Sequence, residues 1–106
     1  MVVTIFRSRL RPERVAEYEV WAERIHNIAV KMPGFISIKT FAADDSERVS
    51  IVEFESEETM IAWRNQPDHR EAQRLGKEKF YSEYHIQVCQ PLRDYSFPKR
   101  NDAPHA

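Results

Sequence analysis

The sequence predicts an α+β domain in which a four-stranded antiparallel sheet carries two helices on one face. Three observations support this fold class: short runs rich in β-branched and aromatic residues, two longer segments with helical periodicity, and Pro or Gly residues between them. In chain order they give strand, helix, strand, strand, helix, strand. Within one domain this order is the ferredoxin-like, or split βαβ, arrangement, and right-handed crossovers place both helices on the same side of the sheet.

The first strand and the first helix are separated by a proline. Residues Val2 to Leu10 predict a strand that stops before Pro12, a favoured first residue of a helix. From Pro12 to Met32, apolar residues recur at alternating steps of three and four positions, as on one stripe of a helix. Pro33 and Gly34 then end the helix, because Pro cannot continue it and Gly permits a turn with positive φ.

The rest of the domain is a hairpin, a broken helix and a last strand. Residues 35–41 and 48–55 predict two strands joined by a polar turn. Ser56 is the expected N-cap of the second helix, which Pro67 interrupts and restarts and Gly76 ends. A fourth strand is expected over residues 81–89. Residues 1–90 thus form the folded domain, and residues 91–106 form an arm with a tail expected to be disordered from Pro98 onward.

Composition excludes several classes of function. The 106 residues carry 16 Lys and Arg against 17 Asp and Glu, a net charge of −1, so there is no basic surface of the kind that nucleic acid requires. No apolar run approaches the roughly 20 residues that span a membrane. Cys89 is the only cysteine, which rules out an internal disulfide and favours a reducing cytoplasm.

Both faces of the predicted sheet carry apolar residues, although two helices can cover only one of them. Residues that alternate along a strand point to opposite faces, and in the first three strands both sets include apolar residues. The opposing sets are Val3 and Ile5 versus Val2, Thr4 and Phe6 in the first strand, Ile36 and Ile38 versus Phe35 and Phe41 in the second, and Val49 and Ile51 versus Val52 and Phe54 in the third. Exposed apolar surface costs about 25 cal/mol/Å². We therefore expect a homodimer through the uncovered sheet face, the alternative being a monomer with a ligand on that face.

The stretch from Trp63 to His69 holds the strongest candidate site. It places an indole, a proline-enforced helix break and an imidazole within two helical turns. A helix that restarts at Pro67 offers unpaired backbone N–H groups, so His69 is expected near a polar site. Trp63 can wall a pocket or fill the core, and His69 can accept a proton or cap the new helix.

The chain resembles the antibiotic biosynthesis monooxygenase family over about residues 2–90. The resemblance rests on the element order, on Met32-Pro33-Gly34-Phe35 before the second strand, and on the Trp63–His69 stretch. It implies a dimeric α+β barrel and, in some members, oxygenation of anthrones and quinols without a cofactor. A haem-degrading branch of the family has an Asn where this chain has Ser8 and a ligating His where it has Gln73. Gln is a poor axial ligand for iron, which disfavours haem.

We therefore expect a cofactor-free monooxygenase of quinol or polyphenol substrates, with His69 as the catalytic base. The expected substrate-binding residues are Trp63, His26, Tyr81 and Tyr84. No flavin, nicotinamide or metal motif is found in the sequence, and no cofactor is expected. Two alternatives remain open: a dimeric module that binds a small hydrophobic ligand or serves a stress response without chemistry, and a structural dimer whose pocket its own side chains fill.

Overall fold

The computed structural model describes residues 1–99 and contains the predicted elements in the predicted order. A 3-10 turn (Pro12–Arg14) precedes the first helix, and a π-helical turn (Gly76–Phe80) precedes the last strand. The strands are β1 (Val2–Leu10), β2 (Phe35–Ala42), β3 (Arg48–Phe54) and β4 (Tyr81–Cys89). The helices are α1 (Val15–Ala29), α2 (Glu57–Arg64) and α3 (Pro67–Leu75).

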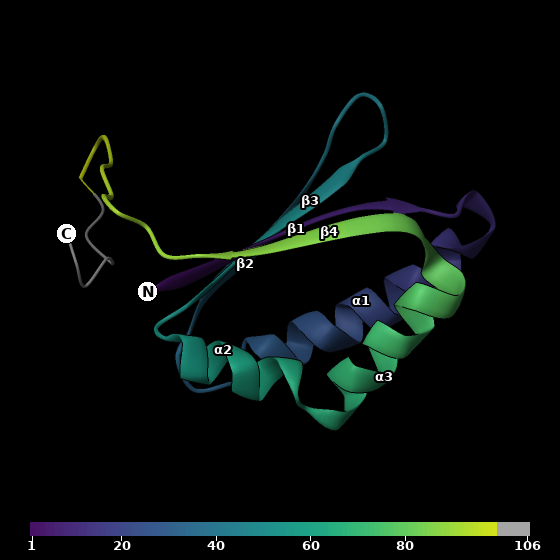
Figure 1. Ribbon diagram of the computed structural model, residues 1–106, viewed down its shortest axis with the longest axis horizontal. Helices are drawn as coiled ribbons and strands as arrows, with labels where there is room; N and C mark the ends of the chain where they lie inside the picture. Colours follow the sequence, from purple (N-terminus) through teal and green to yellow (C-terminus); the bar gives the residue numbers. More distant parts are fainter. Residues whose placement is uncertain (100–106) are drawn as a thin grey trace.

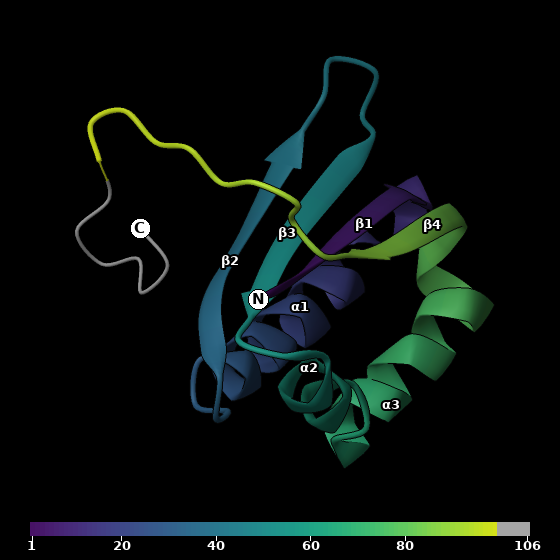
Figure 2. The ribbon, with the colours of Figure 1, turned by 60° about the vertical axis from the view of Figure 1, so that its left-hand side comes forward.

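The four strands form one antiparallel sheet in the order β2-β3-β1-β4, so β2 and β4 are its edges. All three helices lie on the same side of this sheet (Figure 1), with α1 running beneath it and α2 and α3 following one another alongside (Figure 2). This is the ferredoxin-like α+β fold expected from the element order. No helix of residues 1–99 lies against the opposite side of the sheet, which we call the open face.

The core lies between the helices and the sheet, towards the end where β3 leads into α2. Its buried members are Ala29, Val52, Phe54, Met60 and Trp63. Phe54 stacks on Trp63 with ring centroids 5.4 Å apart. Burying side chains of this size stabilises a fold by about 1.5–3 kcal/mol each, so this contact fixes α2 on the sheet.

The predicted alternation of β2 is wrong at its start. Phe35 and Ile38 both pack against the core, although a regular strand would point them to opposite faces. The cause is a register shift between Phe35 and Ser37, where one extra residue changes the parity of the strand. Phe41, paired with Val49, therefore lies on the open face and is 48% exposed.

The two glycines act differently from one another. Gly34 has φ +81° and ends the turn after α1 as expected, with no space for a Cβ beside the Thr59 side chain. α3 ends at Leu75 with Gly76 as its C-cap, as expected, but Gly76 keeps right-handed helical angles and the chain continues as a π-helical turn to Phe80. Its lack of a side chain matters because a Cβ there would lie 2.6 Å from Cε2 of Tyr81.

Beyond Cys89 the chain leaves the domain as an arm that extends away from the sheet (Figure 1). Most of the tail that was expected to be disordered, residues 100–106, lies outside the described residues. Within residues 1–99, no helix is both long enough and apolar enough to cross a membrane.

Candidate functional site

The break at Pro67 folds the chain back so that His69 contacts Trp63. The two ring centroids are 4.3 Å apart, with an interplanar angle of 50°. Nδ1 of His69 lies 3.1 Å from the carbonyl oxygen of Trp63. α2 ends at Arg64 and α3 begins at Pro67, so the imidazole of the second helix closes onto the indole of the first. The structure therefore brings together the two residues that the sequence placed at the centre of the site.

This contact sets the tautomer of His69. A carbonyl oxygen can only accept a hydrogen bond, so Nδ1 carries the proton and donates it, and Nε2 is left with the lone pair. Burial lowers the pKa of the imidazole below its usual 6.5, nearby Arg64 lowers it further, and the hydrogen bond to Trp63 opposes both. At neutral pH the ring is an uncharged base that presents Nε2.

The backbone donors at the start of α3 are already occupied, contrary to expectation. The side-chain oxygen of Gln66 accepts from the N–H groups of Asp68, at 2.8 Å, and of His69, at 3.3 Å. Gln66 thus caps the helix that Pro67 restarts. The polar character of the site comes from the imidazole itself and not from free helix N–H groups.

Two buried side-chain polar atoms within residues 1–99 have no hydrogen-bond partner, and both lie on the helix side of the sheet. They are Nε1 of Trp63 and Oγ1 of Thr4, in side chains only 5% and 7% exposed. Thr4 pairs with Val52 of the core and Val88 of β4. A buried unsatisfied polar group costs about 1–3 kcal/mol, so a ligand that supplied the missing partners would gain by binding here. The sequence had singled out Trp63 but not Thr4, whose only signal is a polar residue among apolar neighbours.

The edge strand β4 is only partly covered on its helix side. Tyr84, Ile86 and Val88 face this side, because they pair with Ser8, Phe6 and Thr4 of β1. Their exposed fractions are nevertheless 40%, 40% and 43%. We call these three residues the β4 strip. The near end of the β4 strip, Ile86 and Val88, forms the candidate site together with Thr4, Trp63 and His69, an apolar surface with a few polar atoms.

Tyr81 and Tyr84 belong to an aromatic cluster at the far end of the same surface. The two rings are 5.8 Å apart between centroids, and Phe6 contacts both, at 5.3 Å from Tyr81 and 5.6 Å from Tyr84. Burial and the neighbouring Tyr18 raise the pKa of Tyr81, so its hydroxyl stays protonated. Val2 pairs with Phe54, on which Trp63 stacks, and Ser8, six residue steps further along β1, pairs with Tyr84. That is roughly 20 Å of strand. The tyrosines are therefore not adjacent to His69.

His26 lies on α1 and its side chain is exposed, unlike the paired rings of Trp63 and His69. A surface hollow of about 420 Å³ does lie nearby, between α1 and the start of α3. Its lining includes Arg24, Ile28 and Asp68 but neither Trp63 nor His69. The hollow is thus separate from the candidate site.

The residues that the structure describes do not fit a metal ion or a haem. Within residues 1–99, no group of three or more His, Cys, Asp or Glu side chains is placed to hold a metal. Gln73, at the position that the haem-degrading branch uses for its ligand, is exposed and donates from Nε2 to the carbonyl oxygen of Arg64 at 3.2 Å. Ser8 is buried in β1.

Fold and site together define a small α+β protein with an apolar surface between sheet and helices. The sequence model of the antibiotic biosynthesis monooxygenase family matches residues 1–75, and the chain belongs to this family. It is 23% identical over 95 residues to the YqjZ protein of Bacillus subtilis, covering 90% of this chain and 83% of that protein.

Solved structures of other proteins share the fold. Rv0793 of Mycobacterium tuberculosis superposes with a TM-score of 0.79 and 19% identity, over 90% of this chain and 98% of that one. SnoaB of Streptomyces nogalater, described as a cofactor-independent oxygenase, gives a TM-score of 0.74 and 15% identity. That match covers 88% of this chain and 94% of SnoaB. At these identities the likeness concerns the fold alone.

Proposed function

We propose that this protein is a cofactor-independent monooxygenase that oxidises a quinol or polyphenol with O₂. One observation carries the proposal: a half-buried imidazole, neutral at physiological pH, whose Nδ1 is fixed by the Trp63 carbonyl so that Nε2 serves as a base beside an indole. A deprotonated phenol can itself donate electrons to oxygen, which makes a base and a water-poor surface the main requirements.

The reaction divides among these groups as follows. His69 accepts the phenolic proton at Nε2, and the resulting phenolate gives electrons to O₂. One oxygen atom enters the ring, which ends as a hydroxyquinone, and the other leaves as water, so the substrate supplies all four electrons. Trp63 orients His69 through its carbonyl and its ring, and its unpartnered Nε1 donates to a substrate oxygen. A bound substrate covers Ile86 and Val88 of the β4 strip, which are 40% and 43% exposed in the free protein.

An oxygen electrode tests the proposal with a panel of hydroquinones and anthrones. We expect the wild type to consume O₂ at least tenfold faster than His69→Ala and His69→Asn, since general-base catalysis typically contributes about 10²–10⁴-fold. Equal and slow consumption by all three would refute it. A ligand that is recovered unchanged, and that binds His69→Ala as tightly as the wild type, would instead identify a binding module without chemistry.

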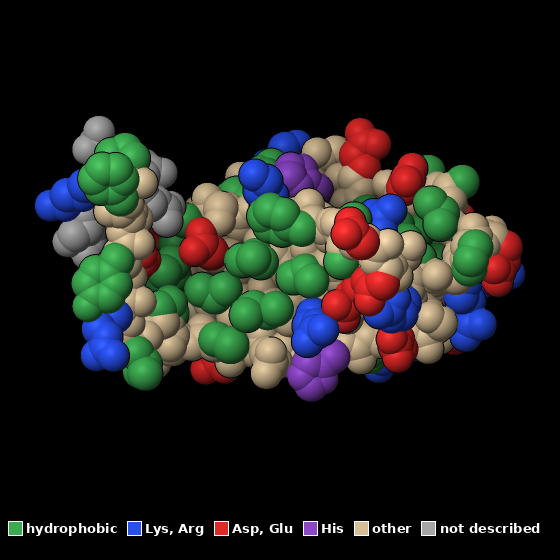
Figure 3. Space-filling model, turned by 90° about the horizontal axis from the view of Figure 1, so that it is seen from above, with side chains coloured by type: hydrophobic (Ala, Val, Ile, Leu, Met, Phe, Trp, Pro, Cys, Tyr) green, Lys and Arg blue, Asp and Glu red, His purple; other side chains and the backbone are tan. Residues whose placement is uncertain are grey.

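We also propose that the protein acts as a homodimer joined through the open face. Figure 3 shows hydrophobic side chains gathered over the half of this face nearest the arm. The strand register places four apolar residues on the open face: Val3, Ile5, Val49 and Ile51. Such a continuous apolar surface is typical of an interface, and a two-fold dimer pairs it with itself.

Light scattering tests this dimer. We expect about twice the 12.6 kDa mass of one chain. Ile51→Arg should shift the population towards monomer, because it buries a charge in the interface. Val20→Arg is the matched control, since Val20 is 60% exposed on α1 and outside the sheet. A wild-type monomer at micromolar concentration would contradict the proposal.

A further inference from the structure

The arm that follows β4 exposes three large apolar side chains almost completely. The exposed fractions of Leu92, Tyr95 and Phe97 are 93%, 85% and 102%. Single exposed apolar residues are common, but three within six residues on a segment outside the domain are not. Burying one aromatic side chain removes about 150–250 Å² from water, which gives this short segment a large unused capacity for contact.

The arm stands on the same side of the sheet as the open face. It leaves the end of β4 and rises away from the helices (Figure 1). Seen onto the open face, its hydrophobic side chains lie next to the apolar half of that face (Figure 3). Any molecule seated on this half of the sheet would therefore lie beside the arm.

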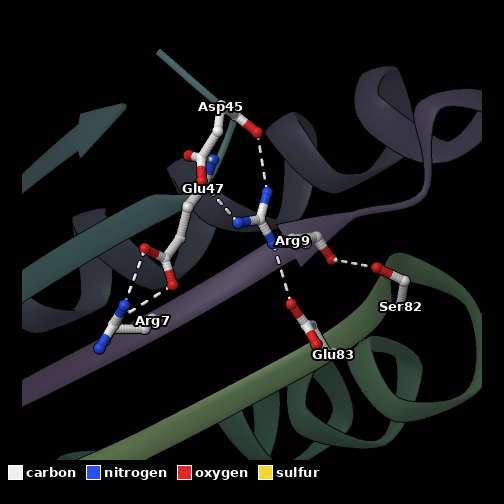
Figure 4. A network of polar contacts seen from close by, with 6 residues as sticks. All are labelled: Arg7, Arg9, Asp45, Glu47, Ser82 and Glu83. Atoms are coloured by element: carbon white, nitrogen blue, oxygen red, sulfur yellow. Dashed lines mark hydrogen bonds and ion pairs between the residues drawn. The ribbon is translucent and has the colours of Figure 1, made fainter. Parts of the chain in front are cut away.

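The other half of the open face is charged but internally paired. Arg7 makes a two-pronged contact with Glu47, both distances being 3.0 Å. Arg9 pairs with Asp45 at 2.8 Å and with Glu83 at 2.9 Å (Figure 4). Because the two guanidinium groups already face three carboxylates, this half has little net field to attract nucleic acid or a strongly charged protein. One half of the open face is thus apolar, and the charges of the other half pair with one another. These properties favour contact with the same surface of a second copy of this chain.

We propose that residues 91–97 form a clasp in which Leu92, Tyr95 and Phe97 of each chain pack against the second copy. This inference rests on the proposed dimer through the open face and extends it to a segment that the family match, residues 1–75, does not include. The arm reaches far enough, since eight extended residues after Cys89 span about 26 Å. The four strands of the sheet are only about 14 Å across.

The area involved is large enough to matter. A stable interface buries about 800 Å² on each partner. Two aromatic side chains provide about 300–500 Å² of this. Removal of the arm should therefore weaken the dimer strongly and leave the fold intact, since the arm lies outside the sheet and the core.

Three variants of the full chain test the clasp by sedimentation velocity. The first ends after Gln90, and the second keeps the full length but carries Leu92→Ser, Tyr95→Ser and Phe97→Ser together. The third, the matched control, ends after Lys99 and keeps the whole described arm. We expect the dimer dissociation constant to rise at least tenfold in the first two and to stay unchanged in the third. Circular dichroism identical to wild type confirms that the fold is retained.

Trypsin provides an independent readout, because Arg93 lies within the arm. We expect cleavage after Arg93 to slow at least tenfold when wild-type protein is concentrated from below to above its dimer dissociation constant. A dimer with unchanged dissociation constants in all variants and concentration-independent cleavage would overturn the clasp and leave the sheet-face dimer standing. A wild type that stays monomeric would overturn both.

Discussion

The carbonyl oxygen of Trp63 accepts a hydrogen bond from Nδ1 of His69, and the indole of the same residue lies 4.3 Å from that imidazole. Trp63 therefore orients His69 through its backbone carbonyl and covers one side of the imidazole with its indole ring. Pro67 makes this possible, because an uninterrupted helix would carry residues 63 and 69 to different sides.

Neutral His69 in the folded state predicts that stability depends on pH. The folded pKa lies below 6.5, the unfolded value, so above pH 6.5 the group is neutral in both states and costs nothing. As the pH falls from 6.5 through the folded pKa, the unfolded chain binds the proton first and the folded state loses stability. Denaturant unfolding between pH 5 and 8 should show this loss in the wild type and a smaller one in His69→Asn. Equal slopes, or an NMR-titrated imidazole pKa above 6.5, would contradict the prediction.

Trp63→Phe should separate the packing role of the indole from its N–H group. The variant keeps an aromatic ring against Phe54 and removes a buried donor that has no partner. We expect a loss of about 1–2 kcal/mol in unfolding free energy, against about 3–5 for Trp63→Ala. With an active quinol substrate, Trp63→Phe should also raise KM more than it lowers kcat. An unchanged KM would show that Nε1 does not reach the substrate.

Gln66→Ala should destabilise the start of α3. The amide oxygen of Gln66 accepts from the N–H groups of Asp68 and His69, and its loss leaves both without that partner. Comparable cap removals cost about 0.5–2 kcal/mol. Amide hydrogen exchange at residues 68 and 69 should accelerate, while Arg70→Ala, on the exposed side of the same helix, should leave it unchanged. Retained protection in Gln66→Ala would show that the cap is not needed.

Gly76→Ala should destabilise the protein even though alanine favours helices. Gly76 has helical angles, so the substitution alone would gain about 1 kcal/mol. The new Cβ would instead lie 2.6 Å from Cε2 of Tyr81, and forced repacking of this kind costs about 1–3 kcal/mol. In a double-mutant cycle, Gly76→Ala should lose less unfolding free energy in the Tyr81→Leu background, because that substitution removes the ring that the new Cβ would meet. A stabilised single variant would contradict the contact.

Local signals in the sequence determined the fold to a large extent. Pro12, Pro33, Gly34 and Pro67 mark boundaries whose physics is local, because ring closure and a missing Cβ act within a few residues. β4 covers the residues predicted for it, Tyr81–Cys89. The alternation of apolar and polar residues that predicts a strand is also local, since it can be recognised without knowing which strands pair with it. Trp63 and His69 were identifiable as a pair because the helix break between them is visible in the sequence.

Tertiary contacts decided the rest. The bulge after Phe35 depends on pairing with Phe54, and Gly76 is required by a ring that packs across it, so neither follows from its own neighbourhood in the chain. Three further features depend on how the helices pack on the sheet. They are the distance between the tyrosines and His69, the exposed position of His26, and the Thr4 hydroxyl that has no hydrogen-bond partner. The sequence alone determined which segments form and where they break, since those preferences are local. Only the tertiary structure decided which side chains meet, because that depends on packing between segments distant in the chain.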